Sequence, residues 1–368
     1  MKENKPIRVL NIVPNMSAAG IETFIMNIYR NIDRNKIQFD FLVHNNEAKF
    51  YDNEILRMGG KIYRLSYKDD KNFFKYINDL NRFFKEHGEY KIVHGHMQSM
   101  MPIYLYYAKK NGVPIRIAHS HNNSYEKSFK GFLLYILSRF AKYTSTHNFA
   151  CSKDSGKYMF NNRDFEIIYN GIDSKKFQYN KNSREKIRKE LGIEDNTLLL
   201  GNVGRIEKQK NQIFLINVFS KLIKDQINVK LLIIGTGSLE EKLKKYVKKM
   251  NLIDDVIFLK NIKNINEYMC AMDAFLLPSL YEGLGIVLIE AQTAGLNCLT
   301  TKETVAKETN ISNKIKYLPL KEDLWVKEIK KLECDNRNIS LYTNNFDIKV
   351  VANKMENKYI EFIKNLGE

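Results

Sequence analysis

Cysteine and long apolar runs are both scarce in this chain, and each absence excludes a class of protein. Four cysteines occur among 368 residues, and no two of them form a Cys-x-x-Cys pair, which excludes a disulfide-stapled fold and a structural zinc site. The cysteines are Cys151, Cys270, Cys298 and Cys334. No segment approaches the roughly 20 apolar residues of a membrane-spanning helix. We therefore expect a cytoplasmic protein, with peripheral contact to the inner face of the plasma membrane left open.

Acidic residues are too few to balance the basic ones. The 59 lysines and arginines against 42 aspartates and glutamates leave a formal net charge of +17. Residues 1–180 carry 28 basic and 17 acidic side chains, and residues 101–150 carry seven basic ones against Glu126 alone. Such a surface suits an anionic membrane, a phosphorylated substrate or nucleic acid, while a lysine-rich composition on solvated faces explains the charge equally well. No helix-turn-helix, zinc-finger or RNA-recognition signature is present, so we expect no nucleic-acid partner.

Buried-strand patterns alternate with helical patterns along the chain. In the first half we predict strands at residues 7–13, 39–44, 91–94 and 115–119, and helices near 21–28, 72–87 and 102–110. In the second half the predicted strands are 198–203, 230–234, 256–259, 274–277 and 297–300, and the predicted helices are 212–224, 239–250, 266–272 and 284–294. This alternation predicts an α/β fold with two doubly wound parallel sheets, whose ligands bind at the carboxyl ends of the strands.

The same pattern divides the chain into domains. We expect a first domain at residues 1–180 and a second at residues 181–345, each Rossmann-like. The polar stretch 174–188 is the linker candidate, because it has few apolar residues. Residues 346–368 form a last helical pattern with no strand after it, which is long enough to pack back toward the first domain.

The most informative segment is residues 282–290. It follows the predicted strand 274–277, so Glu282 belongs to the loop at the carboxyl end of that strand, and residues 283–285 open a helix whose N–H groups face a ligand. Glu290 lies about two helical turns further along. Such a helix start binds a diphosphate while the two carboxylates bind sugar hydroxyls. The alternative is that Glu282 caps the helix and Glu290 pairs with a lysine.

A second cluster of polar residues belongs to the same edge of the predicted sheet. The strand 198–203 ends at Gly204 and Arg205, and Lys210 follows just before the next helix. A guanidinium group binds a phosphate bidentately and an ammonium group binds it as a point charge. Two such cations beside a helix N-terminus favour a nucleotide diphosphate as the ligand.

Taken together, residues 198–301 resemble the donor-binding half of retaining GT-B glycosyltransferases, and of glycosyltransferase family 4 in particular. The resemblance rests on Gly204-Arg205 with Lys210, on Gly235-Thr236-Gly237, and on Pro278 to Gly283 followed by Glu290. It implies a GT-B fold, in which two Rossmann-like domains face a central cleft. It also implies transfer of a sugar from a nucleoside diphosphate sugar, expected to be a UDP-sugar, to a glycan or polyprenyl-linked acceptor of bacterial capsule or exopolysaccharide synthesis.

The resemblance implies a role for each matching residue. Arg205 and Lys210 would neutralise the diphosphate. Glu282 would bind hydroxyls of the transferred sugar, Glu290 would bind the ribose, and the backbone around Asn261 and Ile262 would meet the base. The further donor-binding residues would be Gly20, Gly204, Gly235, Gly237, Ser279, Gly283, Leu284 and Gly285. The catalytic residues would be His121, Arg205, Lys210 and Glu282.

Three segments of the first domain carry the acceptor-side candidates and Gly20. Residues 18–22, Ala-Ala-Gly-Ile-Glu, are similar to the glycine-rich first loop of the family, with Ala19 in place of a glycine, so Gly20 and Glu22 are expected to contact ligand. His121 matches the family histidine that approaches the reacting sugar. The other acceptor-side candidates are His96, His119 and Asn122, the last standing where many members have aspartate. Neutral imidazole is a suitable partner for hydroxyl groups near pH 7.

Apolar residues recur at helical spacing between residues 129 and 140, beside a group of basic residues. The basic residues are Lys127, Lys130, Arg139 and Lys142. An apolar stripe is typical of core packing, whereas a basic amphipathic helix is typical of contact with an anionic leaflet. We interpret the apolar stripe as packed against the protein core and the four basic residues beside it as the membrane contact.

The metal-binding motif Asp-x-Asp is missing, since the chain offers only adjacent pairs such as Asp69-Asp70 and Asp254-Asp255. We therefore expect no metal and no cofactor, with the two cations and the helix dipole stabilising the leaving diphosphate. No carboxylate is an obvious nucleophile, which favours same-face attack over a covalent intermediate. A sugar-nucleotide epimerase or a phosphorylase remains an alternative. A nicotinamide dehydrogenase is disfavoured because the G-x-G-x-x-G fingerprint is absent.

Overall fold

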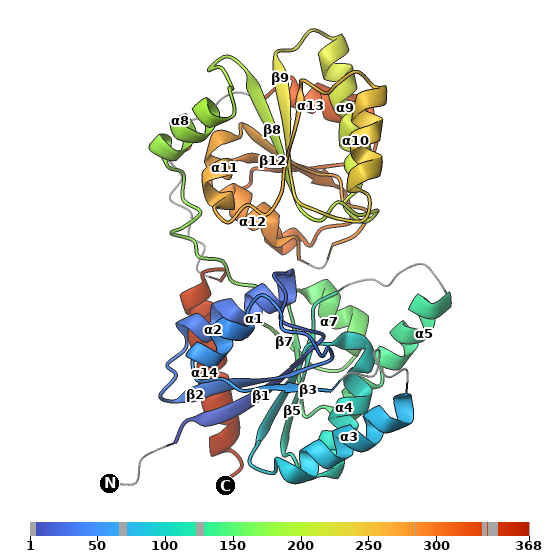
Figure 1. Cartoon of the computed structure of the whole chain (residues 1–368), viewed down its shortest axis with the longest axis vertical. Coiled ribbons are helices and arrows are strands. Elements are labelled where there is room, and N and C mark those ends of the chain that lie inside the picture. The colour runs from blue at the N-terminus through green and yellow to red at the C-terminus, as the bar shows by residue number, and fades with distance from the viewer. Residues whose placement is uncertain are drawn as a thin grey trace. The chain divides into compact units, whose positions relative to one another are not determined.

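The computed structural model describes residues 5–65, 72–122, 129–282, 284–332, 337 and 345–367, and the side chain of Lys130 is outside this set. The chain forms two compact units (Figure 1): residues 1–171 with 345–368 make up unit 1, and residues 172–344 make up unit 2. The division after Gly171 falls earlier than the expected boundary at residue 180, because Phe177 already packs against the core of unit 2.

Unit 1 is built on a seven-stranded parallel sheet. Its strands are β1 (Ile7–Val13), β2 (Ile37–Val43), β3 (Ile62–Arg64), β4 (Ile92–Gly95), β5 (Ile115–Ser120), β6 (His147–Ala150) and β7 (Glu166–Ile167). They lie in the order β3-β2-β1-β4-β5-β6-β7, so the direction of the crossovers reverses between β1 and β4. In such open sheets the ligand crevice lies at the carboxyl ends of the strands beside this reversal.

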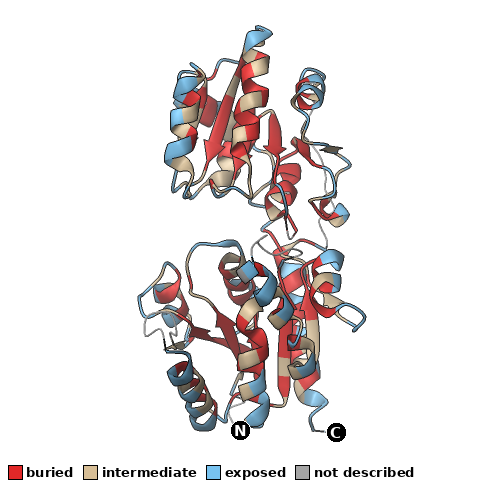
Figure 2. Ribbon diagram, turned by 90° about the vertical axis from the view of Figure 1, so that its right-hand side faces the viewer, coloured by how far each residue is buried: buried red, intermediate tan, exposed pale blue. Residues whose placement is uncertain are grey.

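Helices cover both faces of this sheet. They are α1 (Gly20–Asn31), α2 (Asp52–Arg57), α3 (Phe73–Glu86), α4 (Met101–Lys110), α5 (Phe129–Ser138), α6 (Ala141–Thr144), α7 (Lys153–Phe160) and α14 (Ile348–Lys364), with a 3₁₀ turn at η1 (Gln98–Met100). The apolar faces of α1 and α14 form one core cluster with the sheet, and those of α3 and α4 form a second cluster on the other side. Figure 2 shows the strands buried and the outer faces of the helices exposed.

Unit 2 repeats the design with a six-stranded parallel sheet in the order β10-β9-β8-β11-β12-β13. The strands are β8 (Leu198–Val203), β9 (Val229–Ile234), β10 (Val256–Leu259), β11 (Ala274–Leu277), β12 (Asn297–Thr301) and β13 (Ile315–Leu318). The helices are α8 (Lys181–Glu190), α9 (Gln212–Lys224), α10 (Glu240–Lys249), α11 (Ile265–Ala271), α12 (Ile286–Thr293) and α13 (Glu322–Ile329), with a 3₁₀ turn at η2 (Lys307–Thr309). Helices α9, α10 and α13 pack on one face, and α8, α11 and α12 pack on the other. Both predicted doubly wound α/β sheets are confirmed.

The C-terminal helix α14 belongs to unit 1, as expected. The carboxylate of Glu356 in this helix accepts a hydrogen bond from the backbone N–H of Asp33 at 2.8 Å and from Lys36 at 3.3 Å. Tyr359 is buried beside His94. The chain therefore returns to the first domain after completing the second.

The predicted linker at residues 174–188 is wrong for its second half. Helix α8 packs on unit 2 through Arg184 and Arg188, whose guanidinium groups both pair with the carboxylate of Asp273, at 2.7 Å and 3.1 Å. The Arg188 side chain is buried and also donates to the carbonyls of Glu194 and Thr197. A polar sequence therefore forms a tightly held helix here, because its arginines satisfy a buried carboxylate.

The predicted packing of the apolar stripe between residues 129 and 140 is also wrong. Phe129 is 79% exposed, Leu133 is 50% exposed, and Phe132, Leu134, Ile136 and Phe140 are exposed as well. Helix α5 carries most of these side chains and contacts α4 and η1. Lys127 of the predicted basic flank lies outside the described residues. Within the described part of the chain, no helix is both long and apolar enough to cross a membrane.

Candidate functional site

The loops after β8, β9 and β11 of unit 2 follow parallel strands, so they lie at the same edge of the sheet. The backbone N–H of Gly204, after β8, donates to Ile234 at 3.0 Å, and that of Ile206 donates to Thr236, after β9, at 2.9 Å. A side-chain carbon at Gly235 would lie 2.0 Å from the carbonyl oxygen of Gly204. Glycine is required at Gly235 because any side chain would separate the two loops.

Gly237 is held in the same way as Gly235. A side-chain carbon there would lie 2.2 Å from the carbonyl oxygen of Ile206. The structure thus gives both glycines of the Gly-x-Gly sequence a packing role between two loops, and their predicted contact with a donor stays a prediction.

Lys210 and Glu282 form an ion pair between the loop after β8 and the loop after β11. The Nζ atom of Lys210 lies 2.6 Å from Oε1 of Glu282, and the two side chains are only 15% and 8% exposed. The hydroxyl of the buried Ser279 donates to the same carboxylate oxygen. The stem of Lys210 runs beside Gly204, where an added side-chain carbon would lie 3.3 Å from Cε. Four predicted site residues therefore belong to one connected group.

One backbone hydrogen bond and two from side-chain amides fix these two loops against each other. The N–H of Leu280 donates to the carbonyl of Gln209 at 2.8 Å, and Nε2 of Gln209 donates to the carbonyl of Tyr281 at 2.8 Å. Nδ2 of Asn211 donates to the carbonyl of Pro278 at 3.3 Å. Sequence reasoning missed Gln209 and Asn211, since an amide in a polar loop carries no signal of its partner.

Arg205 lies in the same loop but differs from Lys210 in its surroundings. Its side chain is exposed, while its carbonyl accepts a 3.0 Å hydrogen bond from Gln212 at the start of α9. Gln212 also donates to the buried Asn202, which in turn donates to the carbonyl of Leu276. The backbone beneath Arg205 is therefore anchored to both β8 and β11, and its guanidinium is available at the surface.

Helix α12 carries the second predicted carboxylate. It begins at Ile286 after Gly285, whose φ of 75° favours glycine, and Leu284 is buried. Glu290 is half-buried, and no hydrogen bond to its carboxyl group is found among the described residues. Burial raises the pKa of Glu290 to about 7, and the nearby charge of Lys176 opposes this shift. Gly283 lies outside the described residues.

The residues predicted to meet the base follow β10. Asn261 is exposed with a φ of 58°, and Ile262 packs half-buried against the core cluster beneath α11 and α12. Since β10 is parallel to β9, this turn belongs to the same edge of the sheet as the Gly235 loop.

Four histidines cluster at the corresponding edge of unit 1, where β4 and β5 end. His94, His96, His119 and His121 are all buried, and His121 is the most exposed of them at 7%. Nδ1 of His96 and Nε2 of His121 are 2.9 Å apart, and Nε2 of His94 and Nδ1 of His119 are 3.1 Å apart. Burial lowers the pKa of each ring, to about 3 for His121. All four rings are therefore neutral near pH 7.

Two ring nitrogens of this cluster, Nε2 of His119 and Nδ1 of His121, are buried and have no hydrogen-bond partner in the part of the chain that the structure describes. The cluster includes His94, which the predicted site left out. Nitrogens of His94, His96 and His119 lie within 4.8 Å of one another, a spacing at which a metal could bind. The expected absence of a metal stays a prediction.

The remaining predicted residues of unit 1 are Gly20, Glu22 and Asn122. Gly20 is exposed at the start of α1, and a side-chain carbon there would meet nothing within 4 Å. Glu22 is buried in the first turn of that helix, and Asn122 is exposed, donating to Gln98 at 3.3 Å. Phe24 from α1 contacts the rings of both His119 and His121 edge-on, with centroids 5.7 Å and 5.8 Å away.

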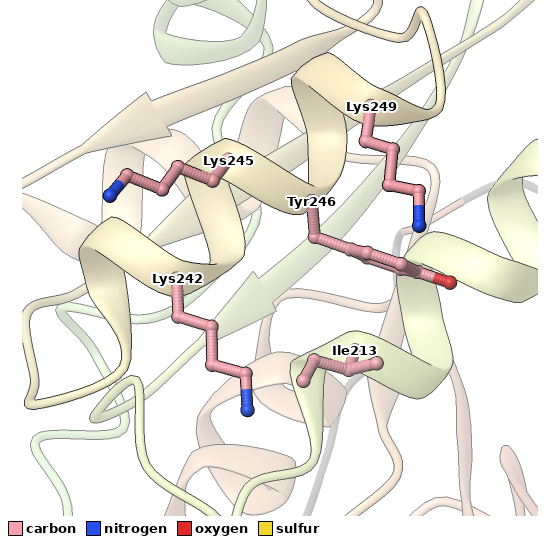
Figure 3. Close-up of a pocket in the computed structure, with 5 residues that line it drawn as sticks. All are labelled: Ile213, Lys242, Lys245, Tyr246 and Lys249. Carbon is pink, nitrogen blue, oxygen red and sulfur yellow. The ribbon is translucent and has the colours of Figure 1, made fainter.

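A pocket of about 370 Å³ lies between α9 and α10, and none of the predicted residues lines it. It is lined by Ile213, Lys242, Lys245, Tyr246 and Lys249, and the Tyr246 ring lies between Lys249 and Ile213 (Figure 3). The hydroxyl of Tyr246 donates to Asn217 at 2.7 Å. The three lysines are exposed, so their attraction for an anion is weakened by water and salt, and we assign them no ligand.

The two halves of the chain match two sequence families. Residues 18–176 match the family described as Glycosyltransferase Family 4, and residues 183–345 match the family described as Glycosyl transferases group 1. The chain is 32% identical over 340 residues to EpsF of Bacillus subtilis (strain 168), which is named as a glycosyltransferase, with 90% of this chain and 88% of that protein covered.

Two further similarities concern substrates and fold. The chain is 27% identical over 303 residues to the UDP-Gal:alpha-D-GlcNAc-diphosphoundecaprenol alpha-1,3-galactosyltransferase of Escherichia coli, covering 75% of this chain and 77% of that enzyme. Its fold is similar to that of HepE from Anabaena, solved in complex with UDP and glucose, with a TM-score of 0.78 at 15% identity over 96% of this chain and 99% of that one. The expected GT-B fold is thus confirmed.

Proposed function

The chain belongs to the family 4 glycosyltransferases, and from this premise we propose that it transfers a sugar from a UDP-sugar to a hydroxyl group of a glycan or polyprenyl-linked acceptor, with retention of the anomeric configuration. The observation that carries the proposal is the Lys210–Glu282 pair beside the exposed Arg205, at the carboxyl edge of the unit 2 sheet. The UDP complex of HepE and the UDP-Gal donor of the Escherichia coli enzyme support the choice of nucleotide.

In the proposed mechanism, the leaving diphosphate is stabilised by this chain's own cations. Arg205 provides a guanidinium group able to bind two phosphate oxygens, and its anchored backbone limits the cost of ordering it. Lys210 uses one of its three N–H groups on Glu282, which leaves two for phosphate. No metal is required in this account, and chelation is expected to leave activity unchanged.

Glu282 is proposed to bind the transferred sugar rather than to attack it. Its Oε1 atom already accepts hydrogen bonds from Lys210 and Ser279, which stabilise the carboxylate and reduce its nucleophilicity. We therefore favour attack by the acceptor hydroxyl on the same face from which the diphosphate leaves. His121, which remains neutral at pH 7, would accept a hydrogen bond from a sugar hydroxyl.

The acceptor is proposed to reside at a membrane, with the protein peripheral on the inner face. The exposed apolar side chains of α5 support this proposal, because burying Phe129 and Leu133 in lipid removes apolar surface from water. Arg139 and Lys142 lie beside them and would attract anionic headgroups. The lipid-linked acceptor of the Escherichia coli relative is consistent with this placement, and we propose a surface polysaccharide precursor as the product.

Incubation with a panel of UDP-sugars and a polyprenyl-diphosphate-linked sugar tests the function. We expect release of UDP that depends on the acceptor, and a product whose anomeric proton shows the configuration of the donor. An inverted product would refute retention. Consumption of donor without any acceptor would instead support an epimerase or hydrolase, and complete loss of activity on chelation would refute metal independence.

A further inference from the structure

The four histidines of unit 1 form two separate hydrogen-bonded chains. In one chain, Oδ1 of Asn11 lies 3.2 Å from Nε2 of His96, and Nδ1 of His96 lies 2.9 Å from Nε2 of His121. In the other, the hydroxyl of Tyr359 lies 2.7 Å from Nδ1 of His94, whose Nε2 atom lies 3.1 Å from Nδ1 of His119. Each hydrogen-bond chain ends at a buried ring nitrogen that has no partner among the described residues.

In the hydrogen-bond chain that begins at Asn11, each hydrogen bond can be donated in only one direction. The amide Nδ2 of Asn11 points to the carbonyl of Val9, so its Oδ1 atom faces His96 and can only accept. His96 must then carry its proton on Nε2, which leaves a lone pair on Nδ1. His121 must in turn carry its proton on Nε2 to donate to that lone pair.

We propose that Asn11 and His96 are positioning residues that fix His121 in the tautomer protonated on Nε2, so that Nδ1 presents a lone pair to a sugar hydroxyl. This positioning role depends on the proposed function only for the identity of the ligand, a sugar hydroxyl. Among the described residues, Nδ1 of His121 has no partner, and this is the independent sign of a ligand, because a buried acceptor without a hydrogen bond is costly unless another group binds it.

The hydrogen-bond chain that begins at Tyr359 has no fixed direction of donation, so it provides a matched control. A phenol hydroxyl can donate or accept, so either tautomer of His94 satisfies the contact. His119 stacks on His121 with centroids 4.1 Å apart, but its Nδ1 atom pairs with His94 and its Nε2 atom has no partner among the described residues. Changing Tyr359 should therefore leave the proton on His121 where it is.

Nitrogen NMR of the histidine rings in the full chain tests the proposal directly. In the wild-type protein near pH 7, we expect Nε2 of His121 to be the protonated, pyrrole-type nitrogen and Nδ1 to be the unprotonated, pyridine-type one. Tyr359→Phe should preserve this pattern. Asn11→Leu removes the acceptor and should give a mixture of both tautomers of His121.

Kinetics add a second readout. Asn11→Leu should lower kcat/KM by about tenfold, as expected for loss of one well-placed hydrogen bond. A wild-type His121 protonated on Nδ1 would overturn the proposal without any variant, even if Asn11→Leu fails to fold. Stoichiometric zinc bound by the histidines of the purified protein would overturn it as well. If instead the tautomers are as stated but no UDP-sugar is used, the proposed function fails and the positioning role stands.

Discussion

Lys210 and Glu282 lie 72 positions apart in sequence and 2.6 Å apart in space, mostly buried, at the junction of two loops. The pair does two things at once. It gives a carboxylate a cationic partner where solvent is largely excluded, and it fixes an ammonium group at the sheet edge. Lys210, which is predicted to bind the diphosphate, and Glu282, which is predicted to bind the sugar, therefore hold each other in position.

We expect Lys210→Ala and Glu282→Ala each to lower the free energy of unfolding by about 3 kcal/mol, because each leaves one buried charge without its partner. The double variant should cost clearly less than the sum of the two. Urea unfolding of the four proteins measures the coupling. Additive losses would show that the two groups do not stabilise each other.

The Glu290→Gln variant should change how stability depends on pH. The folded pKa of Glu290, about 7, lies above its ordinary value of 4.5, so between these values the folded state keeps a proton that the unfolded state releases. Its contribution to stability is therefore complete below pH 4.5 and is lost as the pH rises through 7. At pH 8 the variant should be more stable than the wild type by up to about 3 kcal/mol, and near pH 4.5 the two should be equal. A difference that does not vary with pH would contradict this assignment.

Nucleotide binding should show the opposite dependence on the same group. If the ionised carboxylate of Glu290 binds the ribose, the affinity for UDP should fall as the pH is lowered through about 7. Glu290→Gln should bind UDP more weakly at pH 8 and should lose this part of the dependence. Because UDP itself titrates in this range, calorimetry on the variant provides the control that isolates Glu290. Glu282→Ala should leave UDP affinity nearly unchanged.

Membrane contact through α5 predicts a specific loss. Phe129→Ser with Leu133→Ser should weaken binding to phosphatidylglycerol vesicles at least tenfold, since both side chains are exposed and apolar. Reversing Arg139 and Lys142 to glutamate should weaken it further at low salt and less at high salt. Ile253→Ser, an exposed apolar residue of unit 2, is the matched control and should bind as the wild type does. Vesicle binding unaffected by all these changes would exclude α5 as the contact.

Periodicity predicted most of the fold because a parallel strand buried on both faces leaves a continuous apolar run. The strands at Ile7–Val13 and Leu198–Val203 were predicted with their observed bounds. The short strand at Glu166–Ile167 escaped because two half-buried residues carry no period. Helix α8 was mistaken for a linker because arginines hold it to unit 2. Arginine is usually a surface residue, and the sequence does not show that Asp273 is the partner of both.

The candidate site was predictable as a set of residues but not as a set of contacts. Gly235 and Gly237 could be identified from the Gly-x-Gly spacing, yet their tight contacts with Gly204 and Ile206 depend on how the loops meet. Asn11 carried no signal at all, since a single amide inside a strand resembles an interruption of the apolar run. Its partner His96 comes from another strand, which only the sheet order brings near.

We propose that the edge of the unit 2 sheet binds the diphosphate of a nucleotide sugar, and a change at Arg205 is the sharpest test. Thermal unfolding of the full chain with a panel of nucleoside diphosphate sugars should show a rise in Tm with at least one UDP-sugar. Arg205→Ala should abolish this rise and reduce transfer by about 100-fold or more, while its own Tm without ligand stays unchanged because the side chain is exposed. Lys208→Ala, an exposed cation of the same loop, should behave as the wild type. Protection that is equal in Arg205→Ala and the wild type, or absent with every nucleotide sugar, would contradict the claim.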